Sequence, residues 1–415
     1  SLSLFNSYDI SKKEVDENII KNHWIESDYK ILRNKAKLSS LREDWIKIME
    51  PVIEVMVMEE MKTPRDNYLL NRGSYLEPSY KVGIDVPENL PEMDPSLPKN
   101  RLGLAKWLFS SENPLTSRVT VNRYWQMIFG YGLVRTPEDF GVQGMLPSHP
   151  ELLDWLSIYL INNNWDIKKL IKLMVMSHAY QQKSTSNDKL NEIDPNNVFL
   201  ARSNSYKLPA EIIRDNALAS SGLLVKKVGG PSVKPYQPEG LWLEKNSFSA
   251  DLYNYKKNSG DSLYRRGMYT FIKRTSPPPS MIALDGTSRE VCTVKREKTN
   301  TPLQALVLMN DPQFFEASRI LAERIQKEGG KNYSDQIKYG FRLAISRNPR
   351  DEELKLLSEL YESQLKFYKS NPKMTNQILK VGDKKFDRSL NKYKTAALTM
   401  VSNTILNHDE TYLKR

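Results

Sequence analysis

The run TSRVTVNRYWQMIFG, residues 116–130, decides the fold class. Its apolar side chains recur every three or four residues, as at Val121, Trp125 and Ile128, which is the spacing of one face of an α-helix. Three neighbouring runs share this spacing: RLGLAKWLFS (101–110), PELLDWLSIYLINN (150–163) and DIKKLIKLMVMSHAYQQ (166–182). We therefore predict an α-helical body in this part of the chain.

Helical spacing continues toward the C-terminus, in residues 315–330, 333–346, 351–368 and 388–407. Between the two groups, LPAEIIRDNALASSG (208–222) predicts a helix that begins after Pro209 and ends at Gly222. Two further helix starts lie in NTPLQALVLMNDPQF (300–314). There Thr301 suits the N-cap, Pro302 the first helical position and Gln304 the capping box, and the pair Asp311 and Pro312 marks the next helix.

The preceding residues are predicted to form a small β element. The runs MYTFI (268–272) and REVCTVKRE (289–297) are β-prone, whereas SMIALDG (280–286) is typical of a short helix that Gly286 ends. On a strand over 289–297, Glu290, Cys292 and Arg296 would share a face. The predicted fold class is mainly α, a multi-helix domain with a small embedded β-hairpin or sheet.

The N-terminal hundred residues are predicted to differ from this body. Residues 28–50 have helical spacing that Pro51 ends. The β-prone runs 52–61 and 67–75 predict a small hairpin or sheet edge, and residues 80–99, with four prolines, predict an extended connector.

Composition indicates a globular protein: of 415 residues, 39% are hydrophobic and 27% charged. The net charge of +11 comes from scattered lysines rather than a basic stripe with interleaved aromatics, so we do not expect nucleic-acid binding. No apolar run is long enough for a membrane span, and no signal peptide is visible. The single cysteine, Cys292, excludes an intrachain disulfide and a CxxCH haem-attachment site within these residues.

Charged residues around the predicted strands are the first candidates for a functional site. Arginine and carboxylate side chains together can bind a sugar or an acidic group, and paired carboxylates can act as general acid and base. The catalytic candidates are Asp285, Glu290 and Glu297, and the ligand-binding candidates are Arg274, Arg289 and Arg296. The alternative is a buried ion-pair network that orients the strands and caps neighbouring helices.

Other candidates lie outside this cluster. His149, at a helix start near Asp139, could transfer a proton or bind a ligand, or it could only cap the helix. Trp242 lies in an aromatic loop, residues 236–255, suited to carbohydrate contact. Cys292 is predicted to be a buried apolar filler rather than a nucleophile. The histidine spacing predicts no metal site.

Several long segments resemble the PSD domain of planctomycete-type proteins, a domain of unknown function (domain of unknown function 1553). The segments are residues 113–156, 208–222, 229–233 and 269–314, and the resemblance runs from about residue 57 to the end. It implies a C-terminal domain of a secreted or periplasmic multidomain protein, behind a companion domain and often a cytochrome c-like module that carries haem c. By this comparison residues 1–50 are the helical tail of the companion domain, 51–98 a β-prone segment and Pro-rich connector, and 99–415 the PSD-type domain.

The resemblance implies a role in polysaccharide or sugar catabolism, with carbohydrate as ligand and coupling to cytochrome c-type electron transfer. It implies no established reaction. No cofactor is expected within this chain, since any haem would belong to the upstream module. The alternative is a non-catalytic scaffold that docks the haem-bearing and companion domains.

Overall fold

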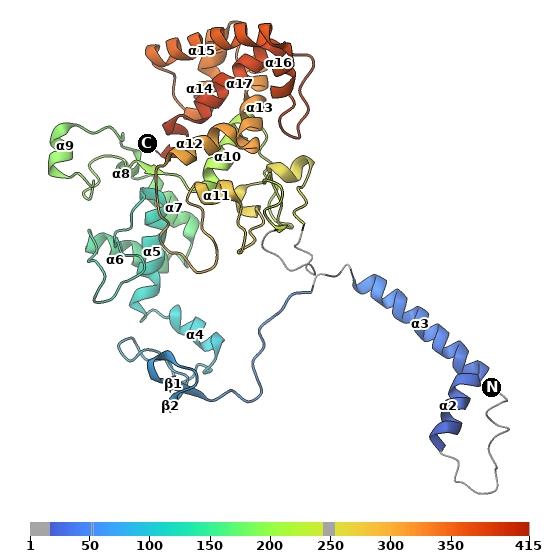
Figure 1. Ribbon diagram of the computed structural model, residues 1–415. Coiled ribbons are helices and arrows are strands. Elements are labelled where there is room, and N and C mark those ends of the chain that lie inside the picture. Colours follow the sequence, from blue (N-terminus) through green and yellow to red (C-terminus); the bar gives the residue numbers. More distant parts are fainter. Residues whose placement is uncertain (1–16, 51, 53, 244–253, 415) are drawn as a thin grey trace. The chain divides into compact units, whose positions relative to one another are not determined.

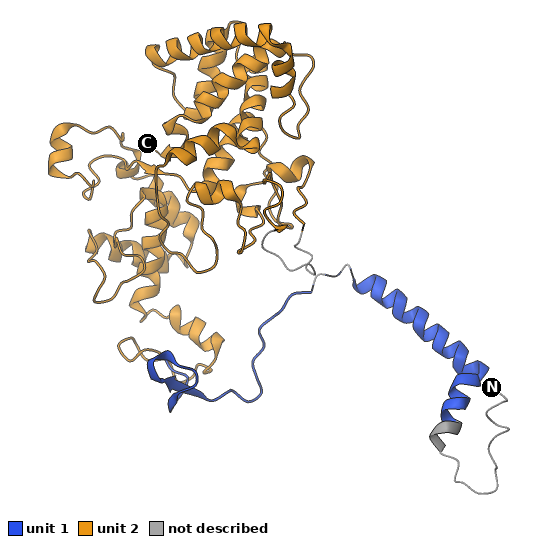
Figure 2. Cartoon of the chain, in the orientation of Figure 1, with its two compact units in different colours: residues 1–85 blue, residues 86–415 orange. Residues whose placement is uncertain are grey.

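A computed structural model describes residues 17–50, 52, 54–243 and 254–414 (Figure 1). The chain divides into two compact units, residues 1–85 and 86–415 (Figure 2). The division falls within the segment for which the sequence predicts a connector. Part of the predicted aromatic loop, residues 244–253, lies outside the described residues.

The first unit contains two helices and a hairpin. Helices α2 (Glu17–Ser27) and α3 (Tyr29–Met49) meet at Asp28, whose carboxylate accepts a hydrogen bond from the Ile31 N–H at 2.9 Å and so caps α3. The helix predicted over 28–50 is confirmed. No residue of α3 is buried.

The hairpin differs from the prediction in its partner strand. Strand β1 (Asn67–Leu70) continues into the short 3₁₀ turn η1 (Asn71–Gly73) and pairs antiparallel with β2 (Pro78–Val82). The predicted strand over 52–61 is wrong: residues 54–61 have no strand structure and are exposed. The partner strand β2 instead overlaps the start of the predicted connector, residues 80–82. The β-propensity of a segment indicates that it can form a strand but does not identify its pairing partner.

The second unit is mainly α-helical, as predicted. Its N-terminal helices are α4 (Arg101–Leu108), α5 (Pro114–Phe129), α6 (Pro150–Asn162), α7 (Ile167–Val175), α8 (His178–Gln181) and α9 (Asp188–Ile193). Helix α10 (Ala210–Ser221) is followed by the short turns η3 (Gly260–Tyr264) and η4 (Gly267–Tyr269). The C-terminal helices are α11 (Pro279–Ala283), α12 (Pro302–Asn310), α13 (Pro312–Glu328), α14 (Tyr333–Ile345), α15 (Asp351–Ser370), α16 (Pro372–Ile378), α17 (Lys392–Leu406) and α18 (Asp409–Tyr412).

The helix boundaries predicted from capping signals are confirmed. Thr301 and Gln304 form a capping box on α12, and the Asp311 carboxylate accepts a hydrogen bond from the backbone N–H of Gln313 at the start of α13. Gly222 ends α10 in the left-handed conformation, with φ of 85°, which a residue without a side chain adopts at little cost.

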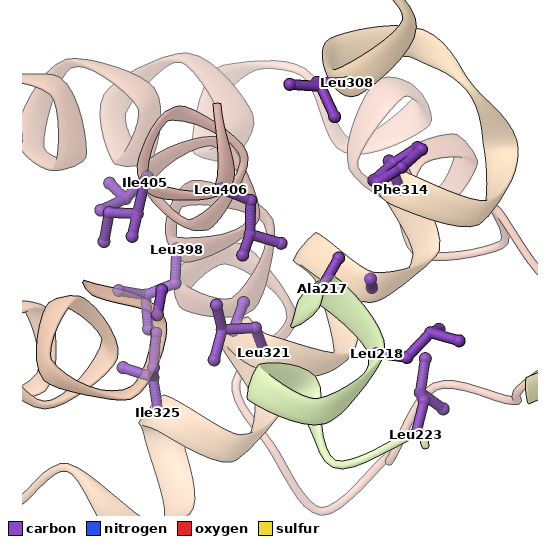
Figure 3. Close-up of a cluster of buried hydrophobic side chains, with 14 of the residues drawn as sticks. Ala217, Leu218, Leu223, Leu308, Phe314, Leu321, Ile325, Leu398, Ile405 and Leu406 are labelled. Atoms are coloured by element: carbon purple, nitrogen blue, oxygen red, sulfur yellow. The ribbon is translucent and has the colours of Figure 1, made fainter. Parts of the chain in front are cut away.

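Two apolar cores stabilise this unit. The smaller one lies between α5, α6 and α7 and includes the stacked rings of Trp125 and Phe129, whose centroids are 4.1 Å apart. The larger one is built on α13 and α17 and extends to α10 and α14 (Figure 3). Figure 3 shows side chains of this core from three of these helices, among them Leu321 of α13, Leu398 of α17 and Leu218 of α10.

A buried charge network holds the loop before α17 against α13. Glu316 is fully buried and accepts hydrogen bonds from Tyr236 Oη at 2.9 Å, Tyr264 Oη at 2.8 Å and the Lys384 N–H at 2.7 Å. Gly382 fits beside it with φ of 95°, because a β-carbon there would lie 2.2 Å from the Glu316 carboxyl carbon. The carboxylate is therefore fully used in structure.

The strands predicted over 268–272 and 289–297 are wrong. The first segment contains η4 and a single β-bridge between Thr270 and Val233, and the second is irregular and mostly exposed. Arg289 has φ of 62°, which interrupts any extended run, so the predicted shared face of Glu290, Cys292 and Arg296 does not form. Cys292 is exposed, so its predicted burial is also wrong.

Regular β-structure in this unit lies elsewhere. Strand β3 (Tyr206–Lys207) pairs antiparallel with β4 (Leu413–Lys414), close to the C-terminus. The segment 408–414, which we call the C-terminal strap, is thereby held next to α10.

Truncating the larger core should destabilise the chain measurably. Leu398 is fully buried, so we expect Leu398→Ala to lower the free energy of unfolding by about 2–5 kcal/mol. The matched change Leu356→Ala, at a side chain that is 66% exposed, should cost about 0.5 kcal/mol or less. Urea denaturation measures both, and equal losses would contradict the assigned core.

Candidate functional site

Helix α10 places two carboxylates on one face. Glu211 and Asp215 are four residues apart, which brings their side chains together on the helix surface. Both line an open pocket of about 670 Å³, within the size range of small-molecule sites. The pocket lies between α10, the end of α14, residues 266–268 and the C-terminal strap.

Glu211 is held in its charged form by arginine. Its two carboxylate oxygens accept hydrogen bonds from the Arg296 guanidinium at 2.7 and 3.2 Å, a bidentate arrangement. Burial opposes ionisation of Glu211, but the hydrogen bonds from Arg296 and the positive charges of Arg296 and Arg289 outweigh it and lower the pKa of Glu211.

The pKa of Asp215 is shifted in the opposite direction, upward. Burial raises the pKa of Asp215, and the negative charge of Glu211 adds to this effect. The N–H of Gly267, at 2.6 Å from Oδ1, and the nearby Arg214 offset it only in part. One helix face thus carries two carboxylates whose pKa values move apart, the arrangement from which acid and base roles arise.

Arg214 fixes the segment that closes this side of the pocket. Its guanidinium is buried and donates to the carbonyl oxygens of Arg265 and Leu263, both at 2.7 Å, and to Gln313 Oε1 at 2.9 Å. Gly267 then lies so close to α10 that a β-carbon at this residue would be 3.0 Å from the Glu211 Cα. The backbone beside Arg266 is therefore firmly placed.

The opposite wall is the C-terminal strap, which Arg347 anchors. The Arg347 guanidinium pairs with Glu353 at 2.7 Å and with Glu410 of the strap at 2.8 Å. Asn216 of α10 donates to the Thr411 carbonyl oxygen at 2.8 Å. The hydrogen bonds from Arg347 lower the pKa of Glu353 to about 2, although burial opposes the shift.

Among the predicted site residues, Asp285 has a carboxylate that is hydrogen-bonded to neighbouring protein groups. Its carboxylate accepts hydrogen bonds from Lys207 Nζ at 2.8 Å, from the Thr299 N–H at 2.9 Å and hydroxyl at 2.6 Å, and from Gln304 Nε2 at 3.3 Å. This network anchors the loop 286–300 at the start of α12. For Asp285 the arrangement matches the alternative of a structural ion-pair network.

The other charged candidates fall into two groups, those that act on a pocket carboxylate and those that lie away from the pocket. Arg296 reaches the pocket carboxylate Glu211, and the charge of Arg289 acts on the same group. Glu290, Glu297 and Arg274 are exposed and line none of the described pockets. Their proposed roles stay predictions.

His149 and Asp139 make separate local contacts. His149 is the N-cap residue of α6, and its Nδ1 lies 3.0 Å from Ser148 Oγ. The Asp139 carboxylate accepts a hydrogen bond from the Gly141 N–H at 2.6 Å. Within the described residues no hydrogen bond joins the two, and a shared function stays a prediction.

Trp242 is buried rather than displayed on a loop surface. It is 2% exposed, its ring contacts those of Tyr255 and Phe271, and the amino groups of Lys234 and Lys273 lie over it at 5.2 and 4.8 Å. Direct ligand contact by Trp242 therefore requires the ring to be uncovered.

The C-terminal strap holds a cluster of potential metal ligands. Ligand atoms of His408, Asp409 and Glu410 lie within 4.8 Å of one another, but Arg347 already pairs with Glu410 and the Glu410 N–H donates to His408 Nδ1. This set fits an ion-pair cluster better than a metal site. Covalent haem does not fit either, because attachment requires two cysteines and the chain has one.

The model of a family described as PSD1, protein of unknown function (DUF1553), matches residues 100–361. The chain belongs to the PSD1 family. The matched range contains α10, Arg266 and Arg296, whereas the C-terminal strap lies beyond it. No curated protein and no solved structure matches the chain significantly.

Sequence reasoning missed Glu211, Asp215 and Arg266. The available signal was the Glu-x-x-x-Asp spacing in LPAEIIRDNALASSG, which puts both carboxylates on one face of a helix that the sequence does predict. This spacing does not reveal which distant residues contact the two carboxylates. Arg296, the partner of Glu211, lies 85 residues away in the sequence. The PSD1 pocket is thus assembled from distant segments.

The strap anchor should make stability depend on pH. The pKa of Glu353 is lower in the folded than in the unfolded chain, so its stabilising effect is present above the unfolded value and lost as pH falls toward 2. We expect Arg347→Met to lower the free energy of unfolding by about 1–3 kcal/mol at neutral pH, and less at about pH 3. Urea denaturation at both values measures this, with the exposed Arg342→Met of α14 as control. A pH-independent gap would contradict the assignment.

Proposed function

We propose that this PSD1 protein recognises a carbohydrate-derived ligand in the α10 pocket, as part of a secreted or periplasmic multidomain protein of polysaccharide or sugar catabolism. The observation that carries the proposal is the pair Glu211 and Asp215, which faces an open pocket with opposite pKa shifts. Carboxylates accept hydrogen bonds from sugar hydroxyl groups, and the side chain of Asn216 adds a polar group to the same wall.

The two carboxylates suit different roles toward such a ligand. Glu211, held ionised by Arg296, can accept hydrogen bonds from hydroxyl groups at neutral pH. Asp215, with its raised pKa, takes up a proton more readily and so can exchange one with a bound ligand. Leu208, Ile212 and Met268 give the pocket apolar surface for the carbon faces of a sugar.

The family resemblance supports the context of this proposal. The resemblance implies a secreted or periplasmic multidomain protein with a role in sugar catabolism, and coupling to a cytochrome c-like module is part of the proposal for the whole protein. Among the described residues, no helix has the length and hydropathy to cross a bilayer. The present chain would provide ligand recognition, whereas any haem would be held by an upstream module.

Filling the pocket tests the proposal without removing a polar contact. Ala219 is an exposed pocket residue of α10, so Ala219→Trp should occupy the ligand volume. We expect the affinity for a bound oligosaccharide to fall roughly tenfold or more, equivalent to about 1.4 kcal/mol. Ala305→Trp, at an exposed alanine of α12, is the matched control and should bind like wild type.

Isothermal titration calorimetry with neutral, uronate and sulfated oligosaccharides provides the measurement. Binding that survives Ala219→Trp would place the ligand elsewhere. A wild-type chain that binds no oligosaccharide of the panel at millimolar concentration would contradict carbohydrate recognition by this portion.

A scaffold role is the second candidate, and α3 favours it. The apolar side chains of Leu38, Leu41, Trp45 and Ile48 recur every three or four residues along α3, and all are exposed. We propose that this stripe packs against an upstream module of the whole protein. The double variant Leu41→Lys, Trp45→Lys should then weaken association with that module when the module is produced separately. The control Lys37→Gln, also on α3, should not. Unchanged association of the double variant would count against docking through α3.

A further inference from the structure

We infer that the ligand of the α10 pocket carries an oxyanion substituent, a carboxylate or a sulfate ester, and that Arg266 binds it. This inference rests on the proposed function and names the class of carbohydrate as acidic. The charged groups around the pocket support it.

Each pocket carboxylate already has an arginine beside it. Glu211 is paired with Arg296, and Glu410 is paired with Arg347. Asp215 lies 3.6 Å from the buried guanidinium of Arg214 and has a raised pKa. Arg347 is shared with Glu353, so each carboxylate of the lining has a guanidinium beside it but the charges do not sum to zero.

Lys414 is a cation of the lining that is already engaged. Its amino group donates to the Ile128 carbonyl oxygen at 3.3 Å and lies 3.9 Å from the centroid of the Tyr180 ring. The contact with Ile128 ties Lys414 to the C-terminal end of α5, where the helix dipole favours a positive charge. Desolvation lowers the pKa of Lys414, as expected for an amino group turned into the protein.

Arg266 differs from all of these groups. It is exposed at the pocket lining, and its guanidinium makes no hydrogen bond or ion pair within the described part of the chain. The adjacent Arg265 shows the contrast, because its guanidinium is buried and donates to the carbonyl oxygens of residues 227, 229 and 231. The guanidinium donors of Arg266 are therefore available to a ligand in the pocket.

Hydrogen bonds hold the backbone on both sides of Arg266, whereas the Arg266 guanidinium makes none within the described residues. The Gly267 N–H is bound to Asp215, and the Arg265 carbonyl oxygen is bound to Arg214. A guanidinium on a fixed backbone presents donors in a planar fork that matches a carboxylate or sulfate in a bidentate way. Bound there, the oxyanion would lie on the same side of the pocket as Asp215, whose pKa the charge of Arg266 already influences.

Three trisaccharides test the inference: trigalacturonate, a monosulfated galactotriose and neutral galactotriose. Each is titrated into the wild-type chain in a calorimeter. We expect at least one acidic probe to bind about tenfold tighter than the neutral one. The uronate and sulfate arms show which oxyanion is preferred. Arg266→Gln should reduce the preference to less than about threefold, because it weakens binding of the acidic probes more than binding of the neutral one. Arg266→Lys should retain part of the preference.

The matched control is Arg388→Gln, which removes an exposed arginine before α17. Arg388 precedes the N-terminus of α17, whereas the C-terminal strap follows its C-terminus. The two ends of this 15-residue helix are about 22 Å apart. Loss of the acidic preference in Arg388→Gln as much as in Arg266→Gln would overturn the inference, because only overall charge would then matter.

Sodium sulfate, titrated alone, separates the two proposals. Equal binding of all three sugars, unaffected by Arg266→Gln, would overturn the oxyanion inference and leave carbohydrate recognition intact. Sulfate binding that depends on Arg266, with no sugar bound, would support the oxyanion site and reject carbohydrate as its source. Absence of binding by every probe would reject both.

Discussion

The pocket depends on one buried guanidinium. Arg214 projects from α10 into the interior, where burial lowers its pKa to about 10, so that it remains charged at neutral pH. Its donors are satisfied by two backbone carbonyl oxygens of residues 263 and 265 and by Gln313 of α13. A buried charge with fewer partners would be strongly unfavourable. The segment 263–267 is therefore bound to α10, which places Arg266 close to Asp215.

Capping signals made the helices predictable, since they act between residues close in sequence. Thr301 and Gln304 needed only each other, and Pro209 and Gly222 mark α10 by their own backbone preferences. The strands were not predictable in this way. Residues 289–297 have β-prone side chains but no neighbouring strand, whereas Tyr206–Lys207 pairs with residues some two hundred positions later. Pairing partners are a tertiary property.

The candidate site was only partly accessible from sequence for the same reason. Arg296 was recognised as a candidate, but its partner Glu211 lies on a helix that the sequence places in a different part of the chain. Asp285 was recognised for its charge, yet its carboxylate serves the backbone and side chain of Thr299. Residue type indicates what a group can do, and the fold decides which of several bonds it makes.

The buried arginines also bear on how this sequence can drift. Arg214, Arg265 and Arg319 each donate to two or more backbone carbonyl oxygens that lie outside the α-helices and strands. The ammonium group of lysine has neither the reach nor the planar fork to serve these oxygens together. Mutational pressure that exchanges arginine codons for lysine codons can act on the surface of this lysine-rich chain, but these three positions would resist it.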